Sequence, residues 1–210
     1  MSNSAKTERN INLENLTVIT GGARSGKSLF AEELARAWKG PVSYIATMPR
    51  IEGDDELAFK VEHHILRRPR QWQTIEAQLS IHERFKDLPG GKGLCIIDCL
   101  SLYVSNIMLD RLKTAQDVVS PQTLKELDID VSEAISALMS AIQEHSATDF
   151  IIVTNEVGWS VVPENKPARL YKDLLGNANQ TVARAAANVY LTCVGLPLKL
   201  KENGRPRLNS

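Results

Sequence analysis

The chain has 210 residues, of which 43% are hydrophobic and 24% are charged, a balance typical of one globular domain with a buried core. Lysine plus arginine and aspartate plus glutamate each number 25, which argues against a general binding surface for nucleic acid or an anionic membrane. Any affinity for phosphate must therefore be local.

The number and spacing of the cysteines and the hydropathy of the chain indicate its cellular compartment. Cys95, Cys99 and Cys193 lie in apolar surroundings without C-x-x-C spacing, so we expect them to be reduced, buried and inert. No apolar run approaches the roughly 18 residues of a membrane span, and the polar start lacks the apolar core of a signal peptide. We expect a cytoplasmic protein with a flexible tail over residues 1–15 and a single nucleotide-binding catalytic domain over residues 16–210.

Residues 16–28, Leu-Thr-Val-Ile-Thr-Gly-Gly-Ala-Arg-Ser-Gly-Lys-Ser, predict a strand, a phosphate-binding loop and the start of a helix. The pattern is G-x-x-x-x-G-K-[ST], in which backbone N–H groups wrap phosphate oxygens, the lysine reaches the β- and γ-phosphates and the serine binds Mg²⁺. The expected nucleotide-binding residues here are Gly21, Gly22, Ala23, Arg24, Ser25, Gly26, Lys27 and Ser28. The helix that follows should end at Gly40-Pro41 and bury Leu29, Phe30, Leu34 and Trp38.

Two strands and a helix are expected next. Residues 42–47 are typical of a strand, and residues 72–77 indicate a weaker one. Between them a helix is predicted from Asp54, which can cap it, to about Arg67. Its buried stripe should consist of Leu57, Val61 and Ile65.

The middle of the chain contains the clearest strand after the first. Residues 94–97 are continuously apolar and lead into Asp98, as expected for a central strand that is covered on both faces. Short helices are predicted over residues 79–88 and 101–108. Residues 110–130 are polar and poorly periodic, so they predict a surface excursion.

The last third continues the alternation of helix and strand. Helices are predicted over residues 131–145 and 168–187, and strands over residues 150–154, 189–194 and 196–200. The alternation predicts an α/β fold of the P-loop NTPase type, with a mostly parallel sheet and helices on both faces. Ligands gather at the carboxyl ends of such strands. The strand ends expected at that edge are Gly21-Gly22, Thr47, Asp98 and Asn155-Glu156.

Asp98 is a candidate metal ligand. A carboxylate at the end of a buried strand can stand beside Ser28, and the two would hold Mg²⁺ directly or through water. Together with Lys27, Asp98 is therefore a candidate catalytic residue. The alternative is a strand-end aspartate that caps the next helix through Ser101.

His63 and His64 adjoin on the helix predicted from Asp54. At about 100° per residue, His64 lies about 20° outside the apolar stripe, whereas His63 points about 160° away from its centre. A half-buried histidine is usually a satisfied core residue, but this helix follows the second strand and can overlook the phosphate site. His64 is therefore the candidate for chemistry.

Two further sites remain open from sequence alone. Arg67, Arg68 and Arg70 form a basic cluster that favours either the dipole of the preceding helix or a nucleotide. Glu76 could accept hydrogen bonds from a purine or ribose, or could simply be solvated.

Taken together, these residues resemble the bifunctional adenosylcobinamide kinase / adenosylcobinamide-phosphate guanylyltransferases of cobalamin biosynthesis, from Leu16 nearly to Leu200. The resemblance rests on five motifs. They are Thr-Gly-Gly-Ala-Arg-Ser-Gly-Lys-Ser at 20–28, Tyr-Ile-Ala-Thr at 44–47, Asp-Asp-Glu-Leu-Ala with His-His at 54–64, Val-Thr-Asn-Glu-Val-Gly with Val-Val-Pro-Glu-Asn at 153–165, and Gly-x-x-Asn-Gln at 176–180.

The resemblance implies two reactions. Adenosylcobinamide is phosphorylated on its aminopropanol hydroxyl by GTP or ATP, and GMP is then transferred from GTP to adenosylcobinamide phosphate through a GMP-histidine intermediate. The family motif implies that this histidine is His64. It also implies nucleotide contacts from Ile65, Leu66, Arg67, Arg68, Glu76 and Asp98. A homotrimer is implied as well.

The sequence departs from the family pattern in two places. The loop over residues 48–53 is slightly longer, and residues 1–15 are an N-terminal extension.

Two other functions are the alternatives. A small-molecule kinase without guanylyl transfer needs the same loop and Asp98 but no nucleophilic histidine. A GTP-dependent switch needs Asn-Lys-x-Asp and Asp-x-x-Gly, which residues 165–168 and 98–101 do not provide.

Overall fold

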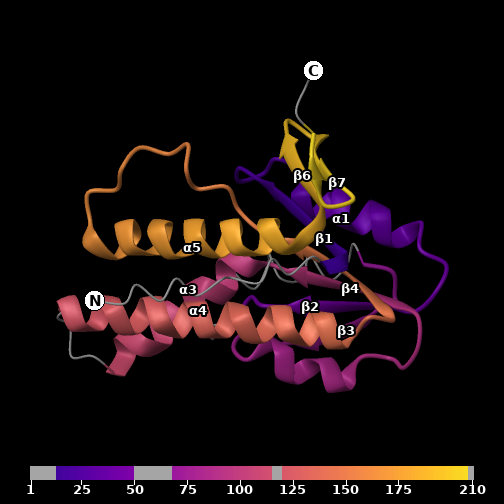
Figure 1. Ribbon diagram of the computed structural model, residues 1–210, viewed down its shortest axis with the longest axis horizontal. Helices are drawn as coiled ribbons and strands as arrows, with labels where there is room; N and C mark the ends of the chain where they lie inside the picture. The colour runs from indigo at the N-terminus through magenta and orange to yellow at the C-terminus, as the bar shows by residue number, and fades with distance from the viewer. Residues whose placement is uncertain (1–12, 50–67, 115–119, 208–210) are drawn as a thin grey trace, which may run out of the picture.

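The computed structural model describes residues 13–49, 68–114 and 120–207. Its sheet has the strand order β3-β2-β4-β5-β1-β6-β7-β8 (Figure 1). The strands are β1 (Leu13–Gly21), β2 (Val42–Ala46), β3 (Gln73–Glu76), β4 (Gly93–Asp98), β5 (Thr148–Val153), β6 (Ala186–Cys193), β7 (Leu196–Glu202) and β8 (Arg205–Pro206). The helices are α1 (Lys27–Arg36), the 3₁₀ helix η1 (Ile81–Asp87), α3 (Leu100–Thr114), α4 (Pro121–Glu144) and α5 (Lys166–Ala185).

The sheet is mostly parallel, as predicted. β1 to β6 pair in parallel, and β7 and β8 then add to the β6 edge in antiparallel fashion. The predicted strands near residues 42, 72, 94, 150, 189 and 196 are all present with small shifts at their ends. The helix predicted from Asp54 lies outside the described residues.

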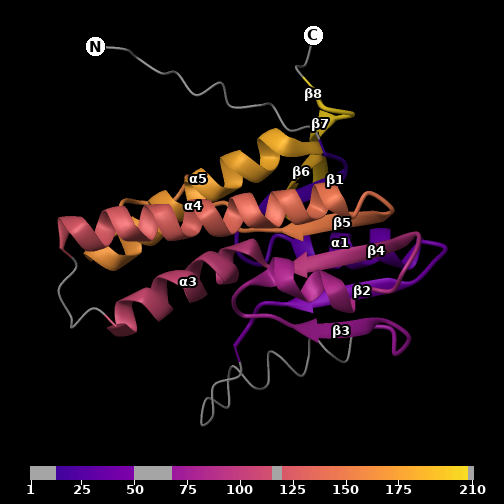
Figure 2. The same cartoon turned by 60° about the horizontal axis from the view of Figure 1, so that its bottom comes forward.

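Helices cover both faces of the sheet. Alternate strand residues such as Val18 and Ile97 belong to the larger core, which η1, α3, α4 and α5 complete. The intervening residues, such as Ile19 and Ile96, belong to a smaller core with α1 (Figure 2). This alternation follows from the two-residue period of a strand.

The stripe predicted for α1 is right in part. Phe30 and Trp38 pack against the smaller core, whereas Ala31 and Ala35, and not Leu29 and Leu34, are its fully buried residues from this helix. Leu29 and Leu34 are 48% and 36% exposed, whereas both alanines are 1% exposed. Small side chains let the helix approach the sheet closely just after the phosphate loop. The helix also ends earlier than predicted, at Arg36.

The surface excursion predicted over residues 110–130 is wrong, because most of that stretch is helical. α3 continues to Thr114 and α4 begins at Pro121, with Ser120 as its N-cap. In Figure 2 the two helices extend beyond the sheet together with the start of α5. Arg111 of α3 there donates to both carboxylate oxygens of Asp130 of α4, at 2.7 and 2.8 Å. Away from the sheet a helix needs few apolar residues, which explains the weak periodicity.

The three cysteines differ in exposure. All are free, and Cys95 is buried whereas Cys99 is half-buried. Burial raises the pKa of the Cys99 thiol to about 11. Cys193 is exposed, so the prediction that it is buried is wrong. It is the last residue of β6 and adjoins the turn into β7. Within the described residues, no helix is both long and apolar enough to cross a membrane.

The first strand begins three residues before residue 16, the predicted start of the catalytic domain. β1 starts at Leu13, which is buried. The Asn15 amide donates to the carbonyl oxygens of Ile142, His145 and Thr148 at 3.3, 3.3 and 2.9 Å, joining β1 to the end of α4 and the start of β5. A polar residue that is typical of a tail is therefore part of the packed structure.

Replacing Asn15 with alanine should destabilise the protein by about 1–3 kcal/mol, because the carbonyl groups that it satisfies lose their donor. Urea unfolding would measure this. Glu14→Ala is the matched control, since Glu14 is an exposed neighbour in the same strand. Equal midpoints for the two variants would contradict the proposed anchoring by Asn15.

Candidate active site

The carboxyl ends of the parallel strands meet at one edge of the sheet, as predicted. The strand register places Glu76, Ala46, Asp98 and Val153 in one row across β3, β2, β4 and β5. Val153 in turn pairs with Ile19 of β1. The residues that follow each strand in sequence therefore surround a common space above this edge.

The phosphate loop lies between β1 and α1 at that edge. A side chain on Gly21 would place its Cβ 2.4 Å from the carbonyl oxygen of Thr192, which a real structure cannot accept. Gly26 has a φ of +99°, in the left-handed region that favours glycine, and its Cβ would lie 3.2 Å from Cα of Gly195. Both glycines are thus required by close packing, Gly21 against the end of β6 and Gly26 against the β6–β7 turn, as well as by the loop's own conformation.

The end of β6 and the β6–β7 turn support the phosphate loop through hydrogen bonds. The hydroxyl groups of Ser25 and Thr192 are 2.8 Å apart, and Thr192 Oγ1 also donates to the carbonyl of Thr20 at 3.1 Å. The N–H of Gly195 donates to the carbonyl of Ser25 at 3.0 Å. Thr192 and Gly195 were not predicted as site residues, since neither belongs to a recognisable motif.

Lys27 is the first residue of α1 and is 7% exposed. Its Nζ donates to the carbonyl of Gly22 at 2.5 Å, which keeps the ammonium group at the loop. Burial lowers its pKa from the ordinary value, while the nearby Cys99 and Asp98 act in the opposite direction. The site therefore brings Asp98 of β4 into the electrostatic neighbourhood of Lys27, as the sequence suggested. Ser28 follows as the second residue of α1.

The Asp98 carboxylate is held by a buried tyrosine. The hydroxyl of Tyr44, a residue of β2 that is 1% exposed, donates to Asp98 Oδ2 at 2.5 Å. Burial, and next the negative charge of Asp98, raise the pKa of Tyr44 well above its ordinary value, so the tyrosine stays protonated. Among the described residues this hydrogen bond favours a role of Asp98 at the site over capping of α3.

Arg68 stacks on the same tyrosine. Its guanidinium carbon lies 3.5 Å from the centre of the Tyr44 ring. Nε and Nη1 of Arg68 are buried and lack a hydrogen-bond partner within the part of the chain that the structure describes. Arg68 thus has donors, unused among the described residues, close to the Asp98 side of the site.

Thr47 supports the strand ends. It is fully buried, and its hydroxyl donates to the carbonyl of Cys99 at 2.9 Å and accepts from the Cys99 N–H at 2.7 Å. The amide of Asn106 donates to the Thr47 carbonyl at 2.8 Å. These bonds fasten the end of β2 to the residue after Asp98, so Thr47 contributes to the site by positioning Asp98.

Glu156 follows β5 directly beside the phosphate loop. Its backbone N–H donates to the carbonyl of Gly21 at 2.9 Å, and its Oε1 accepts from the N–H of Gly158 at 2.5 Å. Asn179 of α5 stabilises this turn, since it accepts from the Thr154 hydroxyl at 2.7 Å and donates to the Asn155 carbonyl at 2.9 Å. Asn179 belongs to the Gly-x-x-Asn-Gln motif, which was the sequence signal for it.

Several predicted residues lie outside the described part of the chain. They are His63, His64, Ile65, Leu66 and Arg67. Glu76 is described and ends β3 at the carboxyl edge of the sheet, with an exposed side chain. The remaining loop residues, Ala23 and Arg24, are exposed between β1 and α1. Nucleotide contacts from all of these residues stay predictions.

Among solved structures, the fold resembles that of an ATPase from the type III secretion system of pathogenic bacteria. The TM-score is 0.51 at 12% identity, covering 88% of this chain and 56% of that one. At this identity the likeness concerns the fold alone, and it agrees with the α/β P-loop architecture.

Sequence relatives cover almost the whole chain. The proteins named bifunctional adenosylcobalamin biosynthesis protein CobU from Escherichia coli and Salmonella typhimurium are 34% and 32% identical over 89% of this chain and 99% of theirs. The corresponding protein CobP of Pseudomonas aeruginosa is 34% identical over 88% of this chain and 96% of its own. Residues 17–200 also match the family described as cobinamide kinase / cobinamide phosphate guanyltransferase. The chain belongs to the cobinamide kinase / cobinamide phosphate guanyltransferase family.

Proposed function

We propose that this enzyme phosphorylates adenosylcobinamide with GTP or ATP and then transfers GMP from GTP to adenosylcobinamide phosphate, giving adenosylcobinamide-GDP. The observation that carries the proposal is the family match over residues 17–200, which includes the whole phosphate loop. The geometry supports it, because Lys27 and the loop adjoin Asp98 at the edge where the strands end. Both reactions use a nucleoside triphosphate, and a single nucleotide-binding site at this edge of the sheet can bind it for both reactions.

The triphosphate would be bound chiefly by the loop. Backbone N–H groups at the start of α1 and the Lys27 ammonium offer positive charge to the phosphates. Burial of Lys27 favours binding of an anion, since an anion restores the interactions that desolvation removes. The support from Thr192 and Gly195 holds these donors in place before the nucleotide arrives.

Mg²⁺ fits the side chains present. Ser28 offers a hydroxyl, and Asp98 offers a carboxylate that one tyrosine hydroxyl orients. Within the described residues no three His, Cys, Asp or Glu side chains gather as a metal cluster. In this proposal Ser28 and Asp98 would hold the ion together with phosphate oxygens and water, and the bound ion would neutralise charge on the phosphates.

Replacing Asp98 with asparagine should lower the turnover of cobinamide phosphorylation by about 10²-fold and weaken GTP binding by less than about tenfold. The amide keeps an oxygen for the Tyr44 hydroxyl but loses the charge that a cation needs. Tyr44→Phe is the complementary control, because it removes the hydrogen bond to Asp98 Oδ2 that Asp98→Asn can keep and leaves the carboxylate charge intact. Equal losses in turnover and affinity for Asp98→Asn would mean that Asp98 is structural.

The guanylyl transfer would use His64 as the nucleophile. The neutral imidazole attacks the α-phosphorus of GTP, the bond to the bridging oxygen breaks, and pyrophosphate leaves. Ile65, Leu66, Arg67, Arg68 and Glu76 are the further nucleotide-binding residues in this proposal. Two buried guanidinium nitrogens of Arg68 have no hydrogen-bond partner within residues 13–49, 68–114 and 120–207, which supports its part, as they need an acceptor that a nucleotide could supply.

We also propose a homotrimer that works in the cytoplasm, where its nucleotide substrates are made. The hairpin formed by β6 and β7 supports the assembly, because Val194, Leu196 and Leu198 are 85%, 70% and 59% exposed. Exposed apolar residues that gather on one element are typical of an interface between subunits. Sedimentation equilibrium would give the number of subunits.

Two labelling reactions test the function. With γ-labelled ATP or GTP, cobinamide should acquire label, and with α-labelled GTP the protein itself should become labelled before cobinamide phosphate is added. A protein that labels cobinamide but never itself would be a small-molecule kinase without guanylyl transfer. A protein that labels neither would contradict the proposed function.

A further inference from the structure

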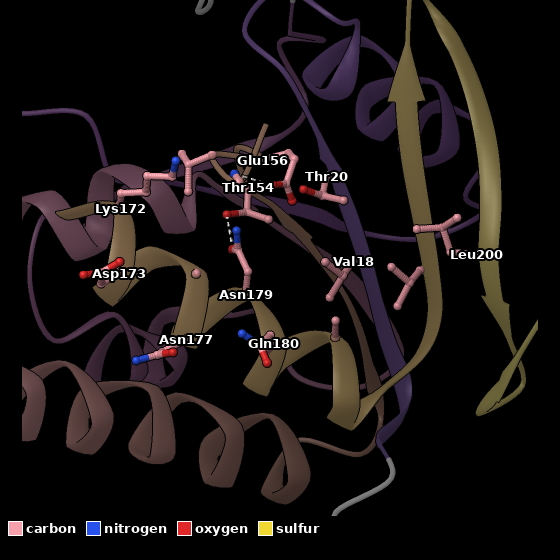
Figure 3. Close-up of a pocket in the computed structure, with 15 residues that line it drawn as sticks. Val18, Thr20, Thr154, Glu156, Lys172, Asp173, Asn177, Asn179, Gln180 and Leu200 are labelled. Atoms are coloured by element: carbon pink, nitrogen blue, oxygen red, sulfur yellow. Dashed lines mark hydrogen bonds between the residues drawn. The ribbon is translucent and has the colours of Figure 1, made fainter. Parts of the chain in front are cut away.

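A cavity of about 640 Å³ opens beside the phosphate loop, and none of the nucleotide-binding residues described above lines it. It lies between α5 and the strands β1, β6 and β7 (Figure 3). Its floor is apolar and includes Val18, Val189 and Leu200, whereas Thr20 and Glu156 lie at its polar end. The α5 wall is polar, since Lys172, Asp173, Asn177 and Gln180 also line the cavity. A cavity of this size with an apolar floor and polar groups around it is typical of a small-molecule site.

The polar end of the cavity adjoins the loop. Thr20 directly precedes Gly21, and the Glu156 N–H donates to the Gly21 carbonyl at 2.9 Å. Figure 3 shows the Thr20 hydroxyl and the Glu156 carboxylate facing one another there. A ligand group at this end would therefore lie next to the loop that binds the phosphates.

Two groups at this end have capacity for a ligand. The Oγ1 atom of Thr20 is buried and has no hydrogen-bond partner among the described residues, although a buried hydroxyl normally has one. Glu156 uses Oε1 to accept from Gly158. A carboxylate has about four acceptor positions, so further positions remain for a donor. A ligand hydroxyl would satisfy both side chains, donating to Glu156 and accepting from Thr20.

We propose that this cavity binds the alcohol-bearing arm of the phosphoryl acceptor and that Glu156 is the general base for its phosphorylation. The inference rests on the proposed function, in which the acceptor presents one reacting hydroxyl on its aminopropanol arm. The side chains of Asn177 and Gln180 on the α5 wall can both donate hydrogen bonds to polar groups of that arm and accept them. The rest of the acceptor would stay outside the cavity.

The step balances in atoms and electrons. The acceptor hydroxyl oxygen forms a bond to the γ-phosphorus of the triphosphate, and its proton passes to the Glu156 carboxylate. The bond between the γ-phosphorus and the bridging oxygen breaks, and its electron pair leaves with the nucleoside diphosphate. Glu156 then returns its proton to water. A base with this role typically contributes about 10²–10⁴-fold to the rate.

Asn179 is a positioning residue in this arrangement. Its amide oxygen accepts from the Thr154 hydroxyl, and its amide nitrogen donates to the Asn155 carbonyl. Asn179 therefore holds in place the two residues that directly precede Glu156. Thr154 is 1% exposed, which leaves the turn little freedom. The carboxylate is thus fixed relative to both the cavity and the phosphate loop.

Glu156→Gln tests the base. The glutamine keeps an oxygen for the Gly158 N–H but cannot accept the proton at neutral pH. We expect kcat for cobinamide phosphorylation to fall at least about 10²-fold, with GTP affinity and self-labelling by α-labelled GTP within about twofold of wild type. The control is Glu133→Gln, an exposed position on α4. Glu156→Gln with wild-type kcat overturns the assignment, and so does a parallel loss of GTP affinity and self-labelling.

Gly176→Leu tests the cavity separately. Gly176 lines it, and a Cβ there would meet nothing within 4 Å, so the larger side chain can enter the cavity without disturbing the core. We expect the KM for cobinamide to rise at least about tenfold, with unchanged GTP affinity. Unchanged cobinamide KM would overturn the cavity assignment. A wild-type protein that neither binds nor phosphorylates cobinamide would overturn the proposed function itself, and this inference with it.

Discussion

Replacing His64 with alanine should abolish self-labelling by α-labelled GTP and reduce guanylyl transfer by at least about 10³-fold. The variant has no group at that position that can form the covalent bond to the α-phosphorus. Imidazole suits the role because its neutral form has a free lone pair near pH 7, and the phosphoramidate remains reactive enough to pass GMP onward. Cobinamide phosphorylation should stay within about tenfold of wild type, since that step needs no covalent intermediate.

The neighbouring histidine is the control for this prediction. His63→Ala should retain the label, because His63 is predicted to point away from the apolar stripe that positions His64. The adduct should be labile in acid and stable in alkali, as a phosphoramidate is. Mass spectrometry that placed GMP on another residue, or guanylyl transfer that persisted in His64→Ala, would contradict the assignment.

Replacing Lys27 with alanine should weaken GTP binding by about 10- to 100-fold, the loss expected for one hydrogen bond to a charged group. Both reactions should decline with it, because both need the triphosphate in the loop. Lys27 is well placed for this effect, since its Nζ already lies at the loop and burial increases the strength of its interaction with an anion. Calorimetric titration with GTP measures the affinity.

Lys39→Ala is the matched control for Lys27→Ala. Lys39 is exposed and follows the end of α1, so its loss removes the same charge from the protein without touching the loop. Thermal unfolding should show that both variants are folded. Unchanged GTP affinity in Lys27→Ala, or an equal loss in Lys39→Ala, would contradict the role of Lys27.

The sequence predicted the burial of some elements better than others. Residues 94–97 were recognised as a central strand because a continuous apolar run has few stable locations outside a covered sheet. The face of α1 was predicted only in part. Phe30 and Trp38 do pack against the core, but periodicity also favoured the exposed Leu29 and Leu34, whereas the close approach to the sheet requires Ala31 and Ala35. The polar stretch around residue 120 was misread for a related reason, since helices beyond the sheet edge need little apolar surface.

By itself, the sequence determined the strand-loop-helix unit over residues 16–28 and the parallel alternation of strand and helix, because both follow from local patterns. Glycines at fixed spacing permit a particular loop, and apolar periods select the element type. Only the tertiary structure decided which distant residues complete the site. Thr192 holds Ser25 of the loop from 167 positions away, and Asn179 holds the turn that carries Glu156. Such contacts arise from packing between elements, and no local pattern in the chain specifies them.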